Sequence, residues 1–321
     1  MPTVPKDLEL FDAHVHSFSH RFFEALAEPL VKRGDLPAEG AVDLIGKRLK
    51  IEIPPPDPKT LADRWVVEMD RHGVQRVVLL TSVVGDEETT AALCRTHPDR
   101  FVGYVMIDPT KPDAETRARR ALTELGLKGM MLFPAMHGFH AWEERVRPIY
   151  QVAAEVGAVA FVHFGLLRVA IRDRLGLPSP FDLRFSNPLD LSGPAMAFPQ
   201  LRFIIPHFGC GFFREALLVG KQCDNVYLDT SSSNNWVEMM PYPLDLQGLF
   251  ARTLGVLGPE RILFGTDSTV FPRGWRSEVF TAQRAALETL GVSRADQAKI
   301  FSGNLTRLLG PWGSRGTGDL R

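Results

Sequence analysis

Cysteine is scarce in this sequence, and its scarcity argues against a fold held together by disulfide bonds. The 321 residues include three cysteines, Cys94, Cys210 and Cys223, and none of them lies in a C-x-x-C pair. An odd number of widely spaced cysteines is not typical of a disulfide framework. We therefore expect a protein that works in a reducing compartment.

The sequence also has no surplus of positive charge and no long apolar run. Lys and Arg number 37 against 38 Asp and Glu, so the formal net charge is −1. Surfaces that bind nucleic acid or anionic membranes are usually basic, so neither partner is expected. No apolar run is long enough to span a bilayer, and the first residues lack the apolar core of a signal peptide. These absences predict a cytoplasmic protein whose partner is a small-molecule substrate.

What the sequence does contain is a regular alternation of short apolar runs and amphipathic stretches. Runs that are apolar on both faces are typical of a parallel sheet covered by helices. Eight β-α units favour a closed (β/α)₈ TIM barrel, of the α/β class, over an open doubly wound sheet. The first turn also lacks the G-x-G-x-x-G pattern of a nucleotide-binding sheet. The expected strands are residues 8–16, 74–80, 101–107, 127–133, 158–163, 201–207, 225–229 and 261–266.

One segment interrupts this alternation after the first expected strand. Within residues 17–58, a helical pattern covers residues 21–50, and a proline-rich run at 54–58 then excludes regular structure. We expect a single barrel domain over residues 1–321. The insertion at 17–58 would be a lid over one mouth of the barrel or a contact between the subunits of a homodimer.

Histidine and aspartate gather where the expected strands end. His14 and His16 lie two residues apart in the first run, so both side chains point to the same face of a strand. The fifth and sixth runs end in His163 and His207, and Asp267 follows the eighth. Active sites of such barrels lie at the carboxyl ends of the strands. These five groups would be costly to bury unpaired, and together they supply imidazole and carboxylate ligands for a metal ion.

The stretches around these residues resemble the amidohydrolase superfamily, and more narrowly its branch that includes aminocarboxymuconate semialdehyde decarboxylase. The resemblance covers nearly the whole chain except residues 21–58. It implies one divalent ion with His14, His16, His163 and Asp267 as ligands and with His207 beside it, facing the substrate. The expected ion is Zn²⁺, with Mn²⁺ or Fe²⁺ as alternatives. The matching stretches are residues 11–16, 128–134, 161–163, 205–209, 263–267 and 303–309.

The fourth expected strand favours one metal ion over two. Relatives with two ions often place a carboxylated lysine or an acidic residue at the end of this strand. Here that end is Met131, Leu132 and Phe133. Lys128 lies at the start of the strand, about 10 Å or more away at the usual rise per residue.

The same residues suit two reactions. In the favoured one, the protein is a hydrolase in which a metal-activated water attacks the carbonyl of an amide, a lactone or a related substrate. Asp267 would transfer the proton and His207 would stabilise the developing oxyanion. In the alternative, the protein is a carboxy-lyase that decarboxylates an aromatic or muconate-type acid without oxidation. The apolar loop at 208–213 offers no second carboxylate clamp, which favours the hydrolase over this alternative. A metal-binding barrel without catalysis, acting as a regulator or scaffold, is a third interpretation.

Candidates for contact with the substrate lie in the loops after the strands. Arg168 and Arg184 follow the fifth strand and Arg273 follows the eighth, and each could anchor an anionic substrate. His137 follows the fourth strand and would reach the mouth of the barrel. Trp236 follows the seventh and could line a flat apolar pocket. Solvent-exposed arginines and packed aromatic rings are the ordinary alternatives for these positions.

Overall fold

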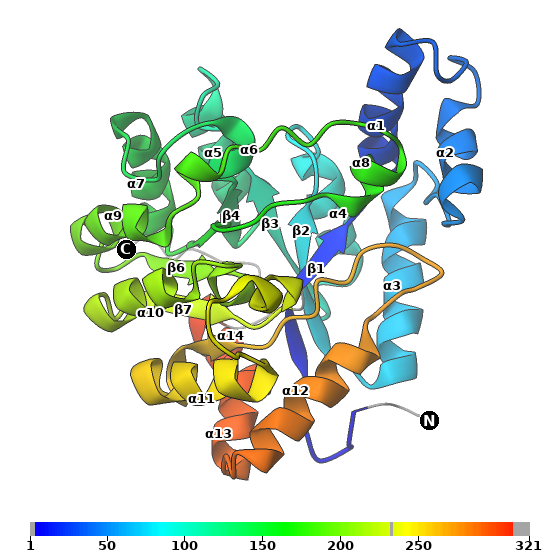
Figure 1. Ribbon diagram of the computed structural model, residues 1–321. Coiled ribbons are helices and arrows are strands. Elements are labelled where there is room, and N and C mark those ends of the chain that lie inside the picture. The colour runs from blue at the N-terminus through cyan, green and yellow to red at the C-terminus, as the bar shows by residue number, and fades with distance from the viewer. Residues whose placement is uncertain (1–3, 232–233, 311–321) are drawn as a thin grey trace, which may run out of the picture.

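Eight parallel strands follow one another around a barrel in the computed structural model, which describes residues 4–231 and 234–310 (Figure 1). The order of the strands in the sheet is their order in the sequence, as repeated β-α units require. The predicted (β/α)₈ TIM barrel is therefore confirmed. The strands are β1 (Phe11–Ser17), β2 (Arg76–Thr81), β3 (Phe101–Met106), β4 (Gly129–Leu132), β5 (Val159–Val162), β6 (Arg202–Ile205), β7 (Val226–Asp229) and β8 (Ile262–Leu263).

The barrel closes between β8 and β1 through a short and irregular seam. Ala13 N donates to Phe264 O at 2.9 Å, Asp267 N to His14 O at 2.9 Å, and His16 N to Ser268 O at 2.8 Å. The strand β8 is shorter than the predicted run 261–266, because the backbone beyond Leu263 finds other partners. Phe264 N, for example, donates to the carbonyl of Ile300 at 3.1 Å. The seam therefore contains His14, His16 and Asp267, which were predicted from the sequence to be metal ligands.

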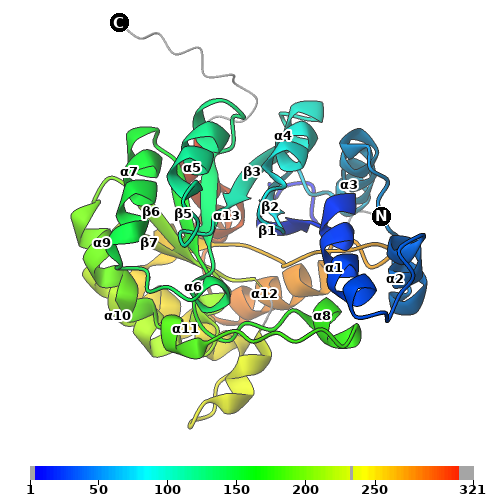
Figure 2. The ribbon, with the colours of Figure 1, turned by 90° about the horizontal axis from the view of Figure 1, so that it is seen from above.

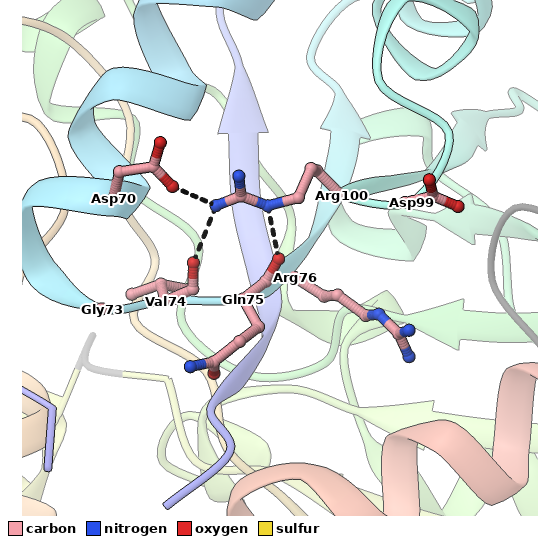
Figure 3. A pocket seen from close by; sticks show the side chains of 7 residues that line it. All are labelled: Asp70, Gly73, Val74, Gln75, Arg76, Asp99 and Arg100. Carbon is pink, nitrogen blue, oxygen red and sulfur yellow. Dashed lines mark hydrogen bonds and ion pairs between the residues drawn. The ribbon is translucent and has the colours of Figure 1, made fainter. Parts of the chain in front are cut away.

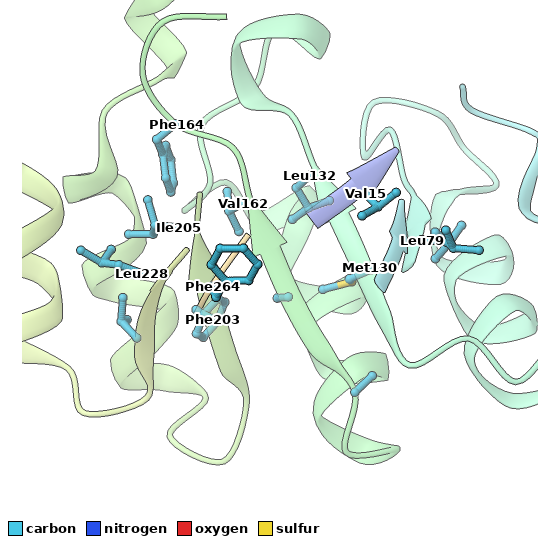
Figure 4. Close-up of a cluster of buried hydrophobic side chains, with 14 of the residues drawn as sticks. Val15, Leu79, Met130, Leu132, Val162, Phe164, Phe203, Ile205, Leu228 and Phe264 are labelled. Atoms are coloured by element: carbon cyan, nitrogen blue, oxygen red, sulfur yellow. The ribbon is translucent and has the colours of Figure 1, made fainter. Parts of the chain in front are cut away.

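Side chains alternate between the inside of the barrel and the layer of helices around it. Buried residues such as Leu79, Leu132 and Ile205 belong to the cluster between strands and helices (Figure 4). Their neighbours along the strands, such as Leu80 and Met131, belong to the separate cluster inside the barrel. Val15 lies in the outer cluster, so His14 and His16 on either side of it point inward.

Helices cover the barrel between its strands, as the alternation of apolar runs and amphipathic stretches predicted. The short helices α6 and α8 were not predicted, because four or five residues carry no helical periodicity. Among the described residues, no helix is long and apolar enough to cross a membrane. The helices are α1 (His20–Lys32), α2 (Ala41–Leu49), α3 (Pro58–His72), α4 (Glu87–Thr96), α5 (Ala114–Thr123), α6 (Pro134–His137), α7 (Arg147–Glu155), α8 (Ala170–Arg174), α9 (Ser192–Ala197), α10 (Phe213–Gln222), α11 (Leu246–Leu257), α12 (Ser277–Thr289), α13 (Arg294–Ala298) and α14 (Asn304–Leu309).

The insertion after β1 has an apolar cluster of its own. Figure 2 shows α1 and α2 side by side at one edge of the barrel. Their buried side chains, among them Phe23 and Ile45, pack with Leu175, which directly follows α8. Val83 and Val270, from the loops after β2 and β8, join the same cluster. The insertion is thus packed against loops at the carboxyl ends of the strands, where the predicted site lies.

Candidate metal centre

Three side-chain atoms from β1 and from the turn after β8 converge at the carboxyl end of the barrel. His14 Nε2 lies 3.4 Å from His16 Nε2, and Asp267 Oδ1 lies 3.6 Å and 3.4 Å from these two nitrogens. His14 is buried, whereas His16 and Asp267 keep 17% and 20% of their side chains exposed. This three-atom group is therefore open to a small ion or molecule from solvent.

The outer nitrogen of each histidine is fixed by a hydrogen bond. Asp229, the last residue of β7, places Oδ2 2.7 Å from His14 Nδ1. Ser82 Oγ lies 3.1 Å from His16 Nδ1 and donates its own proton to the carbonyl of Leu80. Each Nδ1 is therefore the donor to its partner, and in the neutral rings both Nε2 atoms carry lone pairs. Metal-binding histidines are usually oriented in this way.

The three-atom group therefore needs a positive charge at its centre. Two nitrogen lone pairs and a carboxylate oxygen lie within contact distance of one another, which is repulsive unless a cation lies among them. In the ion-free protein a proton can take this place. Burial opposes protonation of His14, but Asp229 and Asp267 outweigh it and raise the pKa of this ring. The donor set, two imidazoles and a carboxylate, is one that Zn²⁺, Mn²⁺ and Fe²⁺ accept.

His163 lies beside this group rather than within it. Its ring centroid is 5.2 Å from that of His207, and its face stacks on Phe133 at 5.4 Å. Burial, with the neighbouring His207 and His14, holds the pKa of His163 well below its usual value, so the ring is neutral. Its Nδ1 is buried and has no hydrogen-bond partner among the described residues. A neutral ring with a free nitrogen suits a further ligand, as a metal site requires.

His207 faces the same centre from β6 and is oriented by Ser231. The centroid of its ring lies 4.9 Å from that of His14. Ser231 Oγ lies 2.9 Å from His207 Nδ1 and 3.0 Å from His14 Nδ1. The backbone carbonyl of Ser231 also lies 3.2 Å from His207 Nδ1, and a carbonyl oxygen can only accept. Burial lowers the pKa of His207, so we assign a neutral ring with its proton on Nδ1, which donates to Ser231, and a lone pair on Nε2.

The backbone is strained where it presents these side chains. Asp267 has φ of 58° and His207 has φ of 54°, in the left-handed region that side chains rarely adopt. The four residues that follow His207 also have positive φ, between 44° and 100°. Such strain persists only where the surrounding structure holds it, and it is typical of functional sites.

The strained turn at residues 207–211 is held in place by close packing between the loops after β5 and β6. A Cβ atom on Gly165, where φ is 81°, would lie 2.1 Å from the carbonyl oxygen of Cys210. Leu166 N donates to that same oxygen at 2.7 Å, and Cys210 Sγ donates to the carbonyl of Leu166 at 3.0 Å. The two loops are thus joined directly after the strands that carry His163 and His207.

Replacing Gly165 by alanine should lower the free energy of unfolding by about 2–5 kcal/mol, since the methyl group would overlap a backbone oxygen in a left-handed conformation. Urea unfolding measures this loss. Gly157→Ala is the matched control, because Gly157 has φ of 68° but no heavy atom within 4 Å of the Cβ position. This control should cost about 1–2 kcal/mol. Equal losses in the two variants would contradict the tight contact.

The predicted substrate-contact residues are not all brought to this centre. Arg168 and Arg184 are 70% and 86% exposed, and each is paired with a neighbouring aspartate of its own loop. Arg273 is exposed as well, and its guanidinium donates to Thr269 Oγ1 of its own loop at 2.6 Å. Burial and Arg276 lower its pKa, against the attraction of Asp267. Trp236 is buried against Phe213 in the core, so it packs as an ordinary aromatic residue.

His137 is the fifth loop candidate, and it lies at the end of α6. Its Nδ1 is buried and has no hydrogen-bond partner in residues 4–231 and 234–310. Burial lowers the pKa of the ring, against the attraction of Asp108. The loops after β3 and β4 thus bring an unpaired nitrogen to the carboxyl end of the barrel, but not to the three-atom group.

A pocket of about 450 Å³ lies at the opposite end of the barrel, where β2 and β3 begin (Figure 3). Arg100 crosses it and donates to Asp70 at 2.8 Å and to the carbonyls of Gln75 and Val74 at 2.7 and 3.0 Å. The chain itself thus satisfies this guanidinium. Because active sites of TIM barrels lie at the other end, we interpret this pocket as part of a structural clamp.

Sequence reasoning missed the residues that orient the histidines. Asp229 ends the expected strand 225–229, and its position at the same edge as His163 was a signal that could have found it. Ser82 and Ser231 carry no such signal, because serine is common in loops. Their role becomes visible only through contacts with His16 and His207 that the fold creates.

Comparison with protein families gives one match. The family model described as Amidohydrolase matches residues 12–310, which include every residue of this centre. No curated protein matches the sequence.

Solved structures share the fold over nearly the whole chain. A 5-carboxyvanillate decarboxylase from Sphingomonas paucimobilis is 17% identical with a TM-score of 0.62, covering 94% of this chain and 99% of its own. A dihydroxybenzoic acid decarboxylase from Polaromonas sp. JS666 with bound manganese is 18% identical, with a TM-score of 0.59 and coverages of 94% and 97%. A probable 2-pyrone-4,6-dicarboxylic acid hydrolase from Acinetobacter baumannii is 11% identical, with a TM-score of 0.60 and coverages of 94% and 100%. At such low sequence identities, these similarities establish that the folds are alike and do not establish a shared reaction.

Proposed function

Because the chain belongs to the amidohydrolase family, we propose that it is a metal-dependent hydrolase that cleaves an amide, a lactone or a related carbonyl compound. The observation that carries this proposal is the three-atom group of His14, His16 and Asp267, in which three acceptor atoms converge around a place for a cation. The hydrogen-bond partners of both histidines, Asp229 and Ser82, support it, since they leave each Nε2 directed at that place.

We assign His14, His16 and Asp267 as ligands of one divalent ion, with His163 as a fourth ligand. When bound, such an ion acts as a Lewis acid and lowers the pKa of water, which supplies a nucleophile at neutral pH. Zn²⁺ suits this donor set, and Mn²⁺ suits it as well. Manganese is the ion bound in the decarboxylase from Polaromonas, which supports Mn²⁺ as the first ion to test.

Asp267 is the proposed proton carrier. Its Oδ1 belongs to the three-atom group, so Oδ2 is the atom that we assign to proton transfer. This oxygen would take a proton from the attacking water and return it to the leaving group. The turn after β8, in which Asp267 has φ of 58°, places this carboxylate beside His14 and His16.

His207 is the proposed donor to the substrate. Its Nδ1 donates to the carbonyl oxygen of Ser231, so Nε2 would donate to the substrate carbonyl after it takes up a proton. A donor aimed at the place where negative charge develops would stabilise the transition state. The residue therefore complements the Asp267 carboxylate, which accepts protons.

The second candidate function is non-oxidative decarboxylation of an aromatic or muconate-type acid. Arg273 favours it, because a cation near Asp267 could bind the carboxylate of such a substrate. Two of the similar structures are decarboxylases, which supports keeping this reaction as the alternative. In this reaction Asp267 or His207, after taking up a proton, would protonate the carbon that loses carbon dioxide.

We also propose that the chain is a single domain in which residues 17–58 cap the mouth of the barrel. Phe18 supports this role, because its ring lies 5.3 Å from that of His16 and stacks on Phe22 of α1 at 4.0 Å. The cap would exclude water from the part of the substrate that lies beside His16.

The test is a comparison of two products from one metal-loaded preparation. Protein reconstituted with Mn²⁺ or Zn²⁺ is incubated with lactones, amides and esters, and separately with dihydroxybenzoic and muconate-type acids. We expect new carboxylic acid products, measured by mass spectrometry, and no release of carbon dioxide. Activity should disappear after chelation and return when the ion is added back. If the acids release carbon dioxide and no lactone, amide or ester is cleaved, the proposed hydrolase is wrong and the protein is a carboxy-lyase.

A further inference from the structure

The carboxylate of Asp12 joins the two segments that carry the three-atom group. Asp12 lies in β1 and is fully buried. Its Oδ1 accepts the backbone N–H of His14 at 2.9 Å and that of Thr266 at 3.1 Å. Its Oδ2 accepts the hydroxyl of Thr266 and, at 2.8 Å, the indole N–H of Trp275. One carboxylate thus binds four donors from both sides of the seam.

The two backbone donors, the N–H groups of His14 and Thr266, lie where the regular strand pairing of β1 and β8 is interrupted. The pairing of β1 with β2 shifts in register between Asp12 and Val15, and the N–H of His14 lies inside this bulge. Thr266 lies beyond the end of β8 and directly before Asp267, whose φ is positive. The carboxylate therefore ties the bulge that presents His14 to the strained turn that presents Asp267.

Trp275 is itself held in place from a second direction. Its backbone N donates to Glu68 Oε1 of α3 at 3.1 Å. Directly before it, Gly274 has φ of 66°, and a Cβ atom there would lie 2.2 Å from the same oxygen. The turn is therefore packed against α3, and the buried indole extends from it to Asp12. This contact fixes the indole N–H independently of the seam.

We propose that Asp12 and Trp275 are a positioning pair for the metal centre. The pair sets the separation between His14 Nε2 and Asp267 Oδ1 through the backbone, since neither of its side chains belongs to the three-atom group. The inference rests on the proposed function in one respect, namely that an ion binds to this group. It adds residues whose effect on the ion is indirect.

Two substitutions separate the members of the pair. In Asp12→Asn, an amide group would direct N–H donors at groups that are donors themselves, so at least one contact at the seam must break. In Trp275→Phe, the ring keeps most of its volume but the N–H is lost. The matched control is Tyr150→Phe on α7, where Tyr150 is also buried and its hydroxyl donates to the carbonyl of Ala141 at 3.0 Å.

The first readout is the affinity for Mn²⁺ alone, measured from the electron paramagnetic resonance signal of the free ion. Loss of residues that orient metal ligands typically weakens binding about 10–100-fold. We expect Asp12→Asn to lie in this range and Trp275→Phe near its lower end, at about 10-fold. Tyr150→Phe should stay within about twofold of the wild type. The thermal midpoints of the metal-free Trp275→Phe and Tyr150→Phe proteins should fall by similar amounts.

The second readout follows the indole of Trp275 directly. In protein labelled with ¹⁵N at tryptophan, the resonance of Trp275 is the one absent from Trp275→Phe. Adding Zn²⁺ should shift this resonance in the wild type and in Tyr150→Phe, because the ion changes the charge beside Asp12. In Asp12→Asn, adding Zn²⁺ should leave the Trp275 resonance unshifted. A pair that only stabilises the fold would not be expected to give this result.

The outcomes separate this inference from the proposed function. Wild-type protein that binds no Mn²⁺ would overturn the proposed function, and the pair with it. Wild-type binding together with unchanged affinity in both variants would overturn the pair alone. If Asp12→Asn does not fold, Trp275→Phe decides by itself. Failure of both variants to fold would make the pair a requirement of the fold and would also refute the positioning role.

Discussion

Replacing Asp267 by asparagine should lower the turnover of the metal-loaded protein by about 10²–10⁴-fold, the usual contribution of a positioned acid–base group. The amide oxygen can still lie beside His14 and His16, so part of the bound metal should be kept. The amide nitrogen cannot take a proton from water, however, and the reaction loses its proton carrier. The measurements are kcat on the substrate found in the product comparison and metal content by elemental analysis.

The control for this variant is another carboxylate that pairs with a histidine. Asp63 on α3 lies 2.7 Å from His97 Nε2 and is 44% exposed on the outside of the barrel. Asp63→Asn should leave kcat within about twofold of the wild type, as expected for a surface pair. Full activity in Asp267→Asn would refute the assignment of proton transfer, whereas a metal-binding scaffold without catalysis would show no turnover in either form.

Replacing His16 by alanine should remove most of the bound metal, to about a tenth of an equivalent or less, because a site of three or four ligands loses one of its two fixed imidazoles. The measurement is elemental analysis after reconstitution with Mn²⁺ and removal of free ion. His97→Ala is the control, since this histidine pairs with Asp63 away from the centre and should keep full metal. A full equivalent of metal in His16→Ala would show that the ion binds elsewhere.

The barrel could be predicted from the sequence because its pattern is strong and local. Val15 between His14 and His16 has the alternation of a strand with one face turned to the helices, and the structure has this orientation. Gly73, which follows the last residue of α3 with φ of 78°, is likewise a local signal, because glycine readily adopts this conformation at the end of a helix. Signals of this kind depend on a few neighbouring residues, so one sequence suffices to detect them.

The details of the centre could not be predicted, because they depend on contacts between residues far apart in the chain. His14 is oriented by Asp229, 215 residues later, and Asp12 is bound by Trp275, 263 residues later. No local pattern announces either contact. The positive φ values at His207 and Asp267 were equally hidden, since both residue types usually adopt ordinary conformations. The exposure of Arg184 likewise depends on how its loop folds.

The irregular seam between β8 and β1 has a consequence for the order in which the protein is made. Two of the assigned ligands, His14 and His16, belong to the first strand to be synthesised, whereas Asp267 follows only after all eight strands. A nascent chain holds an incomplete set of donors until the cylinder has formed around its axis. Binding of the ion is thus a late step in the formation of the protein. A chain truncated before Asp267 would have the histidine ligands but lack the carboxylate ligand.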